Sequence, residues 1–345
     1  MITKNTGGRC TATLLILFCS FAAGCVTRKY VQAQVDQIQR NYALKLERTR
    51  ADLWKNTAAR VQTELFADAY KQASTFTLPV VASARFFDRS VASKLATFVV
   101  LNSDGWIVTA GHVFEYATLF KQDGPEVAQH SQQVSLINAN PLLNAHQKRV
   151  AIDAIRINPH WVTNFSLWWG ADGTTAVNVL ILPEADLAIA RLTPFDPKSI
   201  EVYPTIKNPT ELANGTSLCK LGFPFYSIPV AFDEGSGAFR FPMALLPIPR
   251  FPIEGIYTRT INAGESRDGR YAIQFLETSS PGLPGQSGGP IFDTAGRVWG
   301  IQVRTQSVPL EFSVPDQYLN LGIGVHPALI VQFLKNQGVR FQLSE

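Results

Sequence analysis

The chain has 345 residues, of which 46% are hydrophobic, 17% charged and 11% aromatic, and its net charge is +4. This composition provides for a buried core and excludes a disordered chain, and the small charge gives no reason to expect a nucleic-acid partner. The cysteines have no spacing typical of a zinc site or a disulfide framework; they are Cys10, Cys19, Cys25 and Cys219. We therefore expect no metal and no other cofactor.

Residues 1–24 have the plan of a secretory signal, with two basic residues, a short apolar stretch and small residues before the cleavage point. Cys25 follows directly, and this arrangement resembles a bacterial lipoprotein signal, in which the cysteine is acylated and begins the mature chain. Val26 follows it instead of aspartate, which in Gram-negative lipoproteins favours the outer membrane. The resemblance implies a lipid-anchored protein facing the periplasm. An ordinary signal peptide with a chance cysteine is the alternative.

Residues 26–75 contain no glycine and no proline, and their hydrophobic residues recur at steps of three and four. This pattern predicts a long helix, which we assign to a lipidated stalk at 25–78. The sequence leaves three roles open for this helix: a spacer from the membrane, a self-association helix, or a strip folded against the body. Its excess positive charge indicates a solvated face or attraction to anionic lipid.

After Pro79 the sequence consists of short β-type runs separated by turn residues, for example at 96–101, 105–109, 177–182 and 297–303. Short β-type runs separated by turn residues are typical of an antiparallel all-β sandwich or barrel. One late helix is indicated by Pro327 near its start and Gly338 after its end. Cys219 lies in an apolar run, so we expect a buried, unreactive thiol.

Three segments carry residues of the kind used in serine catalysis. His112 ends a β-type run, Asp186 opens an apolar run, and Ser287 lies in Gly-Gln-Ser-Gly-Gly at 285–289. A serine hydroxyl is a weak nucleophile and needs a base within hydrogen-bond reach. A histidine serves as that base when a carboxylate fixes its other ring nitrogen. The glycines permit a tight loop whose N–H groups point at one spot, which stabilises an oxyanion.

The order His, Asp, Ser resembles the chymotrypsin-like serine peptidases, and residues 90–338 look closest to the HtrA-like branch. The motifs that carry the resemblance are Gly-Phe-Pro at 222–224, Thr278 nine residues before the serine, and Gly-Ile-Gly-Val-His-Pro at 322–327 before a helix. The glycine-serine motif also fits an α/β-hydrolase elbow. An α/β-hydrolase needs its catalytic histidine after the serine, and the only histidine after Ser287 is His326.

The resemblance implies an all-β fold with a chymotrypsin-like double six-stranded β-barrel, to which the residue patterns above add an N-terminal long α-helix and a C-terminal α-helix. The protease domain is expected at 79–345, with barrel 1 at about 79–205 and barrel 2 at about 206–345. In this family the oxyanion hole uses the N–H groups of the serine and of the residue two before it, here Ser287 and Gly285.

The sequence departs from the branch in several places. It ends near the expected close of the protease domain, so no PDZ module is expected. Two insertions are expected, within 120–175 and at 223–253, the second a proline-rich aromatic loop that caps the barrel, covers the site or contacts substrate. Gln286 replaces the commoner Asn or Asp before the serine.

The substrate pocket is read from three positions. Trypsin-like enzymes place an aspartate six residues before the serine, and Pro281 stands there. Without that carboxylate we expect cleavage after small or medium apolar residues. Gly324 is a further pocket candidate, and His326 either packs in the core or lines the pocket.

The sequence thus predicts an exported, lipid-anchored serine endopeptidase that acts on protein or peptide substrates of the cell envelope. The alternative is a binding or scaffolding lipoprotein that keeps the protease fold with a latent site. HtrA-like enzymes commonly form trimers, and a monomer on its stalk is an equal possibility.

Overall fold

The computed structural model describes residues 37, 39–49, 65–224, 228–242, 246–309 and 318–345. The chain divides into two units, Met1–Thr63 and Glu64–Glu345. In the first unit, residues 39–49 are helical and exposed. The predicted signal, Cys25 and most of the predicted stalk lie outside the described residues. Within the described part of the chain, no helix has the length and apolarity needed to cross a membrane.

The second unit begins with a helix that the sequence assigned to the stalk. In α2 (Ala67–Phe76), three side chains at helical spacing, Ala69, Ala73 and Phe76, are buried in the main core. Because this face packs against the body, the boundary expected at residue 79 is wrong: residue 79 lies inside the first strand, β1 (Thr77–Phe86).

The first sheet has six antiparallel strands in the order β4-β1-β2-β3-β6-β5. Its remaining strands are β2 (Val91–Val100), β3 (Trp106–Ala110), β4 (Val162–Trp168), β5 (Thr175–Leu182) and β6 (Leu187–Thr193). Apolar residues such as Val80, Phe98 and Ile189 form its buried face, as expected for a pleated surface buried on one side. Among the described pairings, β4 and β5 are its two open edges.

The second sheet has eight strands in the order β13-β8-β11-β12-β15-β14-β7-β16, and it curls so that β13 also pairs with β14. Its strands are β7 (Thr205–Ile206), β8 (Ser217–Gly222), β11 (Phe251–Glu265), β12 (Ala272–Thr278), β13 (Pro290–Phe292), β14 (Val298–Pro309), β15 (Tyr318–Val325) and β16 (Gln342–Leu343). The chain is mostly β, as the sequence predicts, and the four β-type runs singled out from it are strands. The expected count of six is not met here, because short β7 and β16 extend the sheet.

One hydrophobic core joins the two sheets. Side chains from both lie in one buried cluster, for example Phe98 and Ile189 of the first sheet with Phe275 and Ile323 of the second. Burial of this continuous apolar surface is the main stabilising term of the fold. The last helix, α5 (Pro327–Asn336), packs its apolar face on this core and occupies the segment where the sequence predicts a helix.

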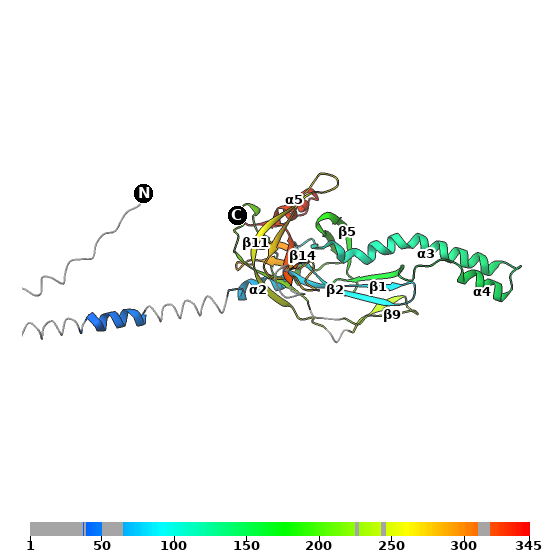
Figure 1. Ribbon diagram of the computed structural model, residues 1–345, viewed down its shortest axis with the longest axis horizontal. Coiled ribbons are helices and arrows are strands. Elements are labelled where there is room, and N and C mark those ends of the chain that lie inside the picture. Colours follow the sequence, from blue (N-terminus) through cyan, green and yellow to red (C-terminus); the bar gives the residue numbers. More distant parts are fainter. Residues whose placement is uncertain (1–36, 38, 50–64, 225–227, 243–245, 310–317) are drawn as a thin grey trace, which may run out of the picture. The chain divides into compact units, whose positions relative to one another are not determined.

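The expected insertion at 120–175 contains two helices that the sequence did not reveal. α3 (Glu115–Ala139) buries only Tyr116, and α4 (Ala145–Asp153) buries no side chain. Figure 1 shows α3 running out past β1 with α4 folded back along it. The other insertion contributes the small hairpin β9 (Ala231–Asp233) and β10 (Ala238–Arg240), with residues 225–227 and 243–245 outside the described part.

Candidate active site

His112 and Asp186 meet because the strands that carry them are paired. β3 ends at Ala110, which lies opposite Leu187 at the start of β6. The short 3₁₀-helix η1 (Gly111–Phe114) then presents His112, and η2 (Pro183–Ala185) presents Asp186. Asp186 has a φ of 50°, a left-handed conformation that aspartate tolerates better than most residues.

Asp186 holds His112 with both carboxylate oxygens. Oδ2 lies 2.7 Å from the ring Nδ1 of His112, and Oδ1 accepts from the backbone N–H of His112 at 2.8 Å. A carboxylate oxygen facing Nδ1 makes that nitrogen the proton donor, so the neutral ring keeps Nε2 as a proton acceptor. The two side chains are 41% and 29% exposed, so the ring remains accessible to a substrate.

Ser287 lies on the loop between β12 and β13, and the first sheet holds this loop in place. Thr97 of β2 donates its backbone N–H to Ser287 O at 2.8 Å and its hydroxyl to Gly285 O at 2.7 Å. The side chain of Gln286 is fully buried and anchors the loop from inside, with Oε1 accepting from Leu283 N at 3.0 Å. Gln286 thus supplies a local hydrogen bond in place of the commoner Asn or Asp.

Two glycines of the loop leave no room for a side chain. Gly285 has a φ of 89° and Gly288 a φ of 85°, both in the left-handed region. A Cβ at residue 285 would overlap the carbonyl of Phe223, and one at residue 288 would overlap the carbonyl of Thr97. The motif is glycine-rich because the loop packs directly against two other backbone segments.

The N–H groups of Gly285 and Ser287 donate to no acceptor among the described residues. Their neighbours are satisfied, since Gln286 N donates to Leu283 O at 2.9 Å and Gly288 N to Gln302 O at 2.7 Å. Backbone N–H groups are rarely left without an acceptor inside a structured loop. These two are the donors that the sequence assigns to an oxyanion hole.

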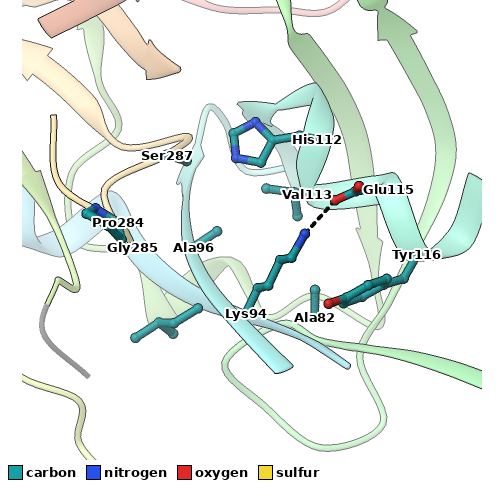
Figure 2. Close-up of a pocket in the computed structure, with 11 residues that line it drawn as sticks. Ala82, Lys94, Ala96, His112, Val113, Glu115, Tyr116, Pro284, Gly285 and Ser287 are labelled. Atoms are coloured by element: carbon teal, nitrogen blue, oxygen red, sulfur yellow. Dashed lines mark hydrogen bonds and ion pairs between the residues drawn. The ribbon is translucent and has the colours of Figure 1, made fainter. Parts of the chain in front are cut away.

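Two pockets flank Ser287. The larger, of about 710 Å³, has His112 in its wall, and Figure 2 shows the imidazole beside Ser287. Its other lining residues are Ala82, Lys94, Leu95, Ala96, Val113, Glu115, Tyr116, Pro284 and Gly285. The smaller, of about 220 Å³, is lined by Gly282, Leu283, Pro284, Gln302, Val303, Arg304 and Thr305 as well as Ser287. No described carboxylate lines the smaller pocket.

The three residues expected at the substrate pocket are not brought together there, and none lines either pocket. Pro281 is adjacent to the smaller pocket, and its carbonyl accepts from Lys220 Nζ at 2.9 Å. Gly324 is buried in β15 against Ile291 and Ile301. His326 is 5% exposed and caps α5, with Nδ1 accepting from Ala328 N at 3.2 Å. Packing therefore accounts for Gly324, and for His326 the structure agrees with the packed alternative, in which the side chain caps α5.

Sequence reasoning missed Lys220 and four residues around the nucleophile. Lys220 is 1% exposed, and its ammonium donates to Thr278 Oγ1 and to the carbonyls of Ser280 and Pro281. Burial lowers the pKa of Lys220 to about 7. The other four are Thr97, Lys94, Glu115 and Tyr116. The one available signal was that Glu115 and Tyr116 follow His112 by three and four residues.

The remaining titratable groups fit structural roles. Cys219 is buried, as expected, and burial raises the pKa of its thiol to about 12, so it stays protonated and unreactive. In the described residues no cluster of His, Cys, Asp and Glu has the geometry of a metal site. The chemistry available at this place is that of a serine, a histidine, a carboxylate and two backbone N–H groups.

A profile of the trypsin-like peptidase domain family matches residues 96–301, which include all three candidate catalytic residues. The chain therefore belongs to the trypsin-like peptidase domain family, a class of serine proteases. No curated protein sequence matches it.

Among solved structures the chain is similar to HtrA-type proteases. A variant of the HtrA-type protease AlgW with a decapeptide has a TM-score of 0.45 and 15% identity, over 79% of this chain and 67% of that one. AlgW with a tripeptide has a TM-score of 0.43 and 17% identity, over 79% of this chain and 64% of that one.

Proposed function

We propose that the protein is a serine endopeptidase in which Ser287 is the nucleophile, His112 the general base and acid, and Asp186 the residue that orients His112. One observation carries the proposal: His112, whose Nδ1 lies 2.7 Å from Asp186 Oδ2, lines the same pocket as Ser287. Family membership supports the same chemistry.

In the proposed reaction, Ser287 Oγ attacks the scissile carbonyl while its proton passes to His112 Nε2. The tetrahedral intermediate collapses as the C–N bond breaks, and the proton moves from Nε2 to the leaving amine. Water then hydrolyses the acyl-enzyme by the same relay in reverse. None of the described hydrogen bonds joins Ser287 to His112, and such bonds are often long until substrate binds.

The N–H groups of Gly285 and Ser287 would bind the oxyanion of the tetrahedral intermediate. Both lack an acceptor among the described residues, so no internal hydrogen bond has to break before they act. Loss of one such donor typically costs about 3 kcal/mol of transition-state stabilisation. The loop therefore favours a site that is formed at rest over a latent one.

For the acyl side of the substrate we propose a small or medium apolar residue. The smaller pocket has a volume of about 220 Å³, and no described carboxylate lines it to pair with a basic side chain. A peptide library in which Arg or Lys is preferred before the cut would contradict this assignment.

We also propose that the protein is exported, anchored by a lipid on Cys25, and acts on proteins of the cell envelope. The support is the pattern of residues 1–25. Substitution of Cys25 by Ser should abolish incorporation of radiolabelled palmitate and release the protein from the membrane fraction. Equal labelling of both forms would contradict the anchor.

The nucleophile is tested with a fluorophosphonate probe, which reacts only with an activated serine. Detergent-solubilised full-length chain should be labelled, and Ser287→Ala should not. Ser307→Ala, which changes an exposed serine on β14, is the matched control and should label like the wild type. Equal labelling of wild type and Ser287→Ala, or of neither, would refute the proposed nucleophile.

A further inference from the structure

The larger pocket beside Ser287 has chemistry that the catalytic residues do not use. Two of its lining residues, Glu115 and Tyr116, are the first residues of α3, so the helical insertion forms part of its wall. Its volume of about 710 Å³ falls in the range of roughly 300–1,000 Å³ that is typical of ligand pockets. The assignment below rests on the proposed peptidase function.

The position of His112 identifies which part of a substrate this pocket faces. Both pockets include Ser287, but only the larger one includes His112. His112 gives its proton to the leaving amine in the proposed reaction, so the residue that follows the scissile bond lies on the histidine side. The larger pocket is therefore the leaving-group pocket.

The wall of the leaving-group pocket is mostly apolar and built from small side chains. Ala82, Ala96 and Val113 are buried, and their short side chains leave the space open. An apolar side chain that fills this space is removed from water, which stabilises the complex in proportion to its area. The pocket thus suits a bulky hydrophobic body.

Lys94 and Glu115 of the pocket wall form an ion pair. Lys94 Nζ lies 2.6 Å from Glu115 Oε2 and 5.0 Å from the centre of the Tyr116 ring. Because the two charges compensate each other, the pocket offers no unpaired charge to a charged substrate residue. The pair lies beside the ring of Tyr116, which forms part of the pocket wall.

One polar group in the pocket has no partner. Tyr116 is 5% exposed, and its hydroxyl makes no hydrogen bond to any described residue. Figure 2 shows this hydroxyl pointing into the space between Lys94 and Ala82. Burial raises the pKa of Tyr116, so the group stays a protonated donor that can also accept. A hydroxyl that faces the pocket without a protein partner is free to bond to a ligand that offers one.

We propose that the leaving-group pocket holds an aromatic side chain on the substrate residue directly after the scissile bond, with tyrosine preferred over phenylalanine because its hydroxyl bonds to that of Tyr116. The ring of the substrate residue contacts the apolar wall, and the hydroxyl of a substrate tyrosine bonds to the hydroxyl of Tyr116. Residues at the start of the α3 insertion therefore determine specificity.

The experiment uses full-length protein in detergent and peptides from a proteome digest, with the residues around each cut read by mass spectrometry. Aromatic residues should be enriched after the cut. A cleaved peptide is then synthesised with Tyr, Phe or Ala at that position. We expect kcat/KM for Tyr to exceed that for Phe about fivefold and that for Ala about tenfold or more.

The variant Tyr116→Phe removes only the hydroxyl. It should reduce the Tyr-to-Phe ratio of kcat/KM to about one, as expected when one net hydrogen bond is lost. The ratio within each protein is the readout, so differences in the amount of active enzyme cancel. Tyr318→Phe, at an exposed tyrosine of β15, is the matched control and should keep the wild-type ratio.

Cleavage without aromatic enrichment, or a Tyr-to-Phe ratio that Tyr116→Phe leaves unchanged, would overturn the pocket assignment and leave the peptidase function standing. No cleavage of any peptide, with or without labelling of Ser287, would overturn the proposed function and the pocket assignment with it.

Discussion

Thr97 donates two hydrogen bonds to the loop that carries Ser287, one from its hydroxyl to Gly285 O and one from its backbone N–H to Ser287 O. Thr97 belongs to β2 of the first sheet, whereas the loop lies between β12 and β13 of the second. These bonds hold the carbonyls of Gly285 and Ser287, so the first sheet restrains the backbone that carries the proposed oxyanion donors.

Thr97→Val should lower the rate of fluorophosphonate labelling about tenfold, because it replaces the hydroxyl with a methyl group of nearly the same size. The buried carbonyl of Gly285 then keeps only one of its two donors, Phe223 N at 3.2 Å. In peptide cleavage the loss should fall on kcat rather than KM. Thr97→Ser keeps the hydroxyl and should retain most of the activity. Equal rates for Val and Ser variants would show that the hydroxyl does not hold the loop.

Asp186→Asn should lower kcat about ten-thousand-fold at neutral pH. The amide has the same size as the carboxylate, but it donates where Nδ1 must donate, and this favours the wrong tautomer of His112. Cleavage and fluorophosphonate labelling both measure the effect. Asp196→Asn, which changes a surface cap of η3 (Pro197–Ser199), should behave as wild type. A loss of less than tenfold in Asp186→Asn would remove Asp186 from the proposed site.

Gly288→Ala should disrupt the loop, both by backbone strain at a positive φ and by overlap of the new Cβ with neighbouring atoms. Gly215→Ala separates these two causes. Both glycines have a φ of 85°, but only at residue 288 would a Cβ overlap other atoms, whereas residue 215 faces open space. We expect Gly215→Ala to cost about 1–2 kcal/mol from backbone strain alone. Gly288→Ala should lower the melting temperature further and abolish labelling. Similar melting temperatures for the two variants would refute the close packing.

The protein should lose stability as the pH falls from about 6.5 toward 4. Burial lowers the pKa of His326 from 6.5 to about 4, so in this window the unfolded chain binds a proton that the folded chain does not. At pH 4.5 this linkage costs about 2–3 kcal/mol of unfolding free energy relative to pH 7.5.

His326→Asn isolates that contribution, since asparagine keeps the cap of α5 and does not titrate. Urea unfolding of both proteins at pH 7.5 and pH 4.5 gives the comparison, and every other titrating group is common to the two. The variant should lose less stability than the wild type on acidification. Parallel losses would mean that His326 is protonated in the folded state.

The sequence predicted the site better than its surroundings, for a physical reason. His112 and Asp186 are 74 residues apart, but each stands at the end of a recognisable β-type run, and paired strands bring such ends together. The glycines around Ser287 were visible because a tight loop tolerates few other residues. By contrast, the sequence did not place Tyr116 in the pocket wall, because the start of α3 directly after η1 was not predicted.

Helix α3 was harder to predict because its residues lack a simple periodic pattern. α3 contains Gly124 and Pro125, which favour turns, and hydrophobic residues such as Leu136 remain exposed. In α2 the helical stripe was recognised, but Ala69 and Ala73 look the same in a solvated stalk as in a packed helix. His326 was placed near the pocket from family resemblance, although its position before Pro327 is that of an N-cap.

Because the Ser287 loop depends on Thr97, a chain that has not finished folding is protected against the proposed peptidase activity. A chain in which only the second sheet has formed lacks both of the hydrogen bonds that Thr97 donates to the loop, and it lacks His112 and Asp186, so it carries the proposed nucleophile without the residues that activate it. Hydrolytic competence of the proposed site therefore arises only when the two halves dock.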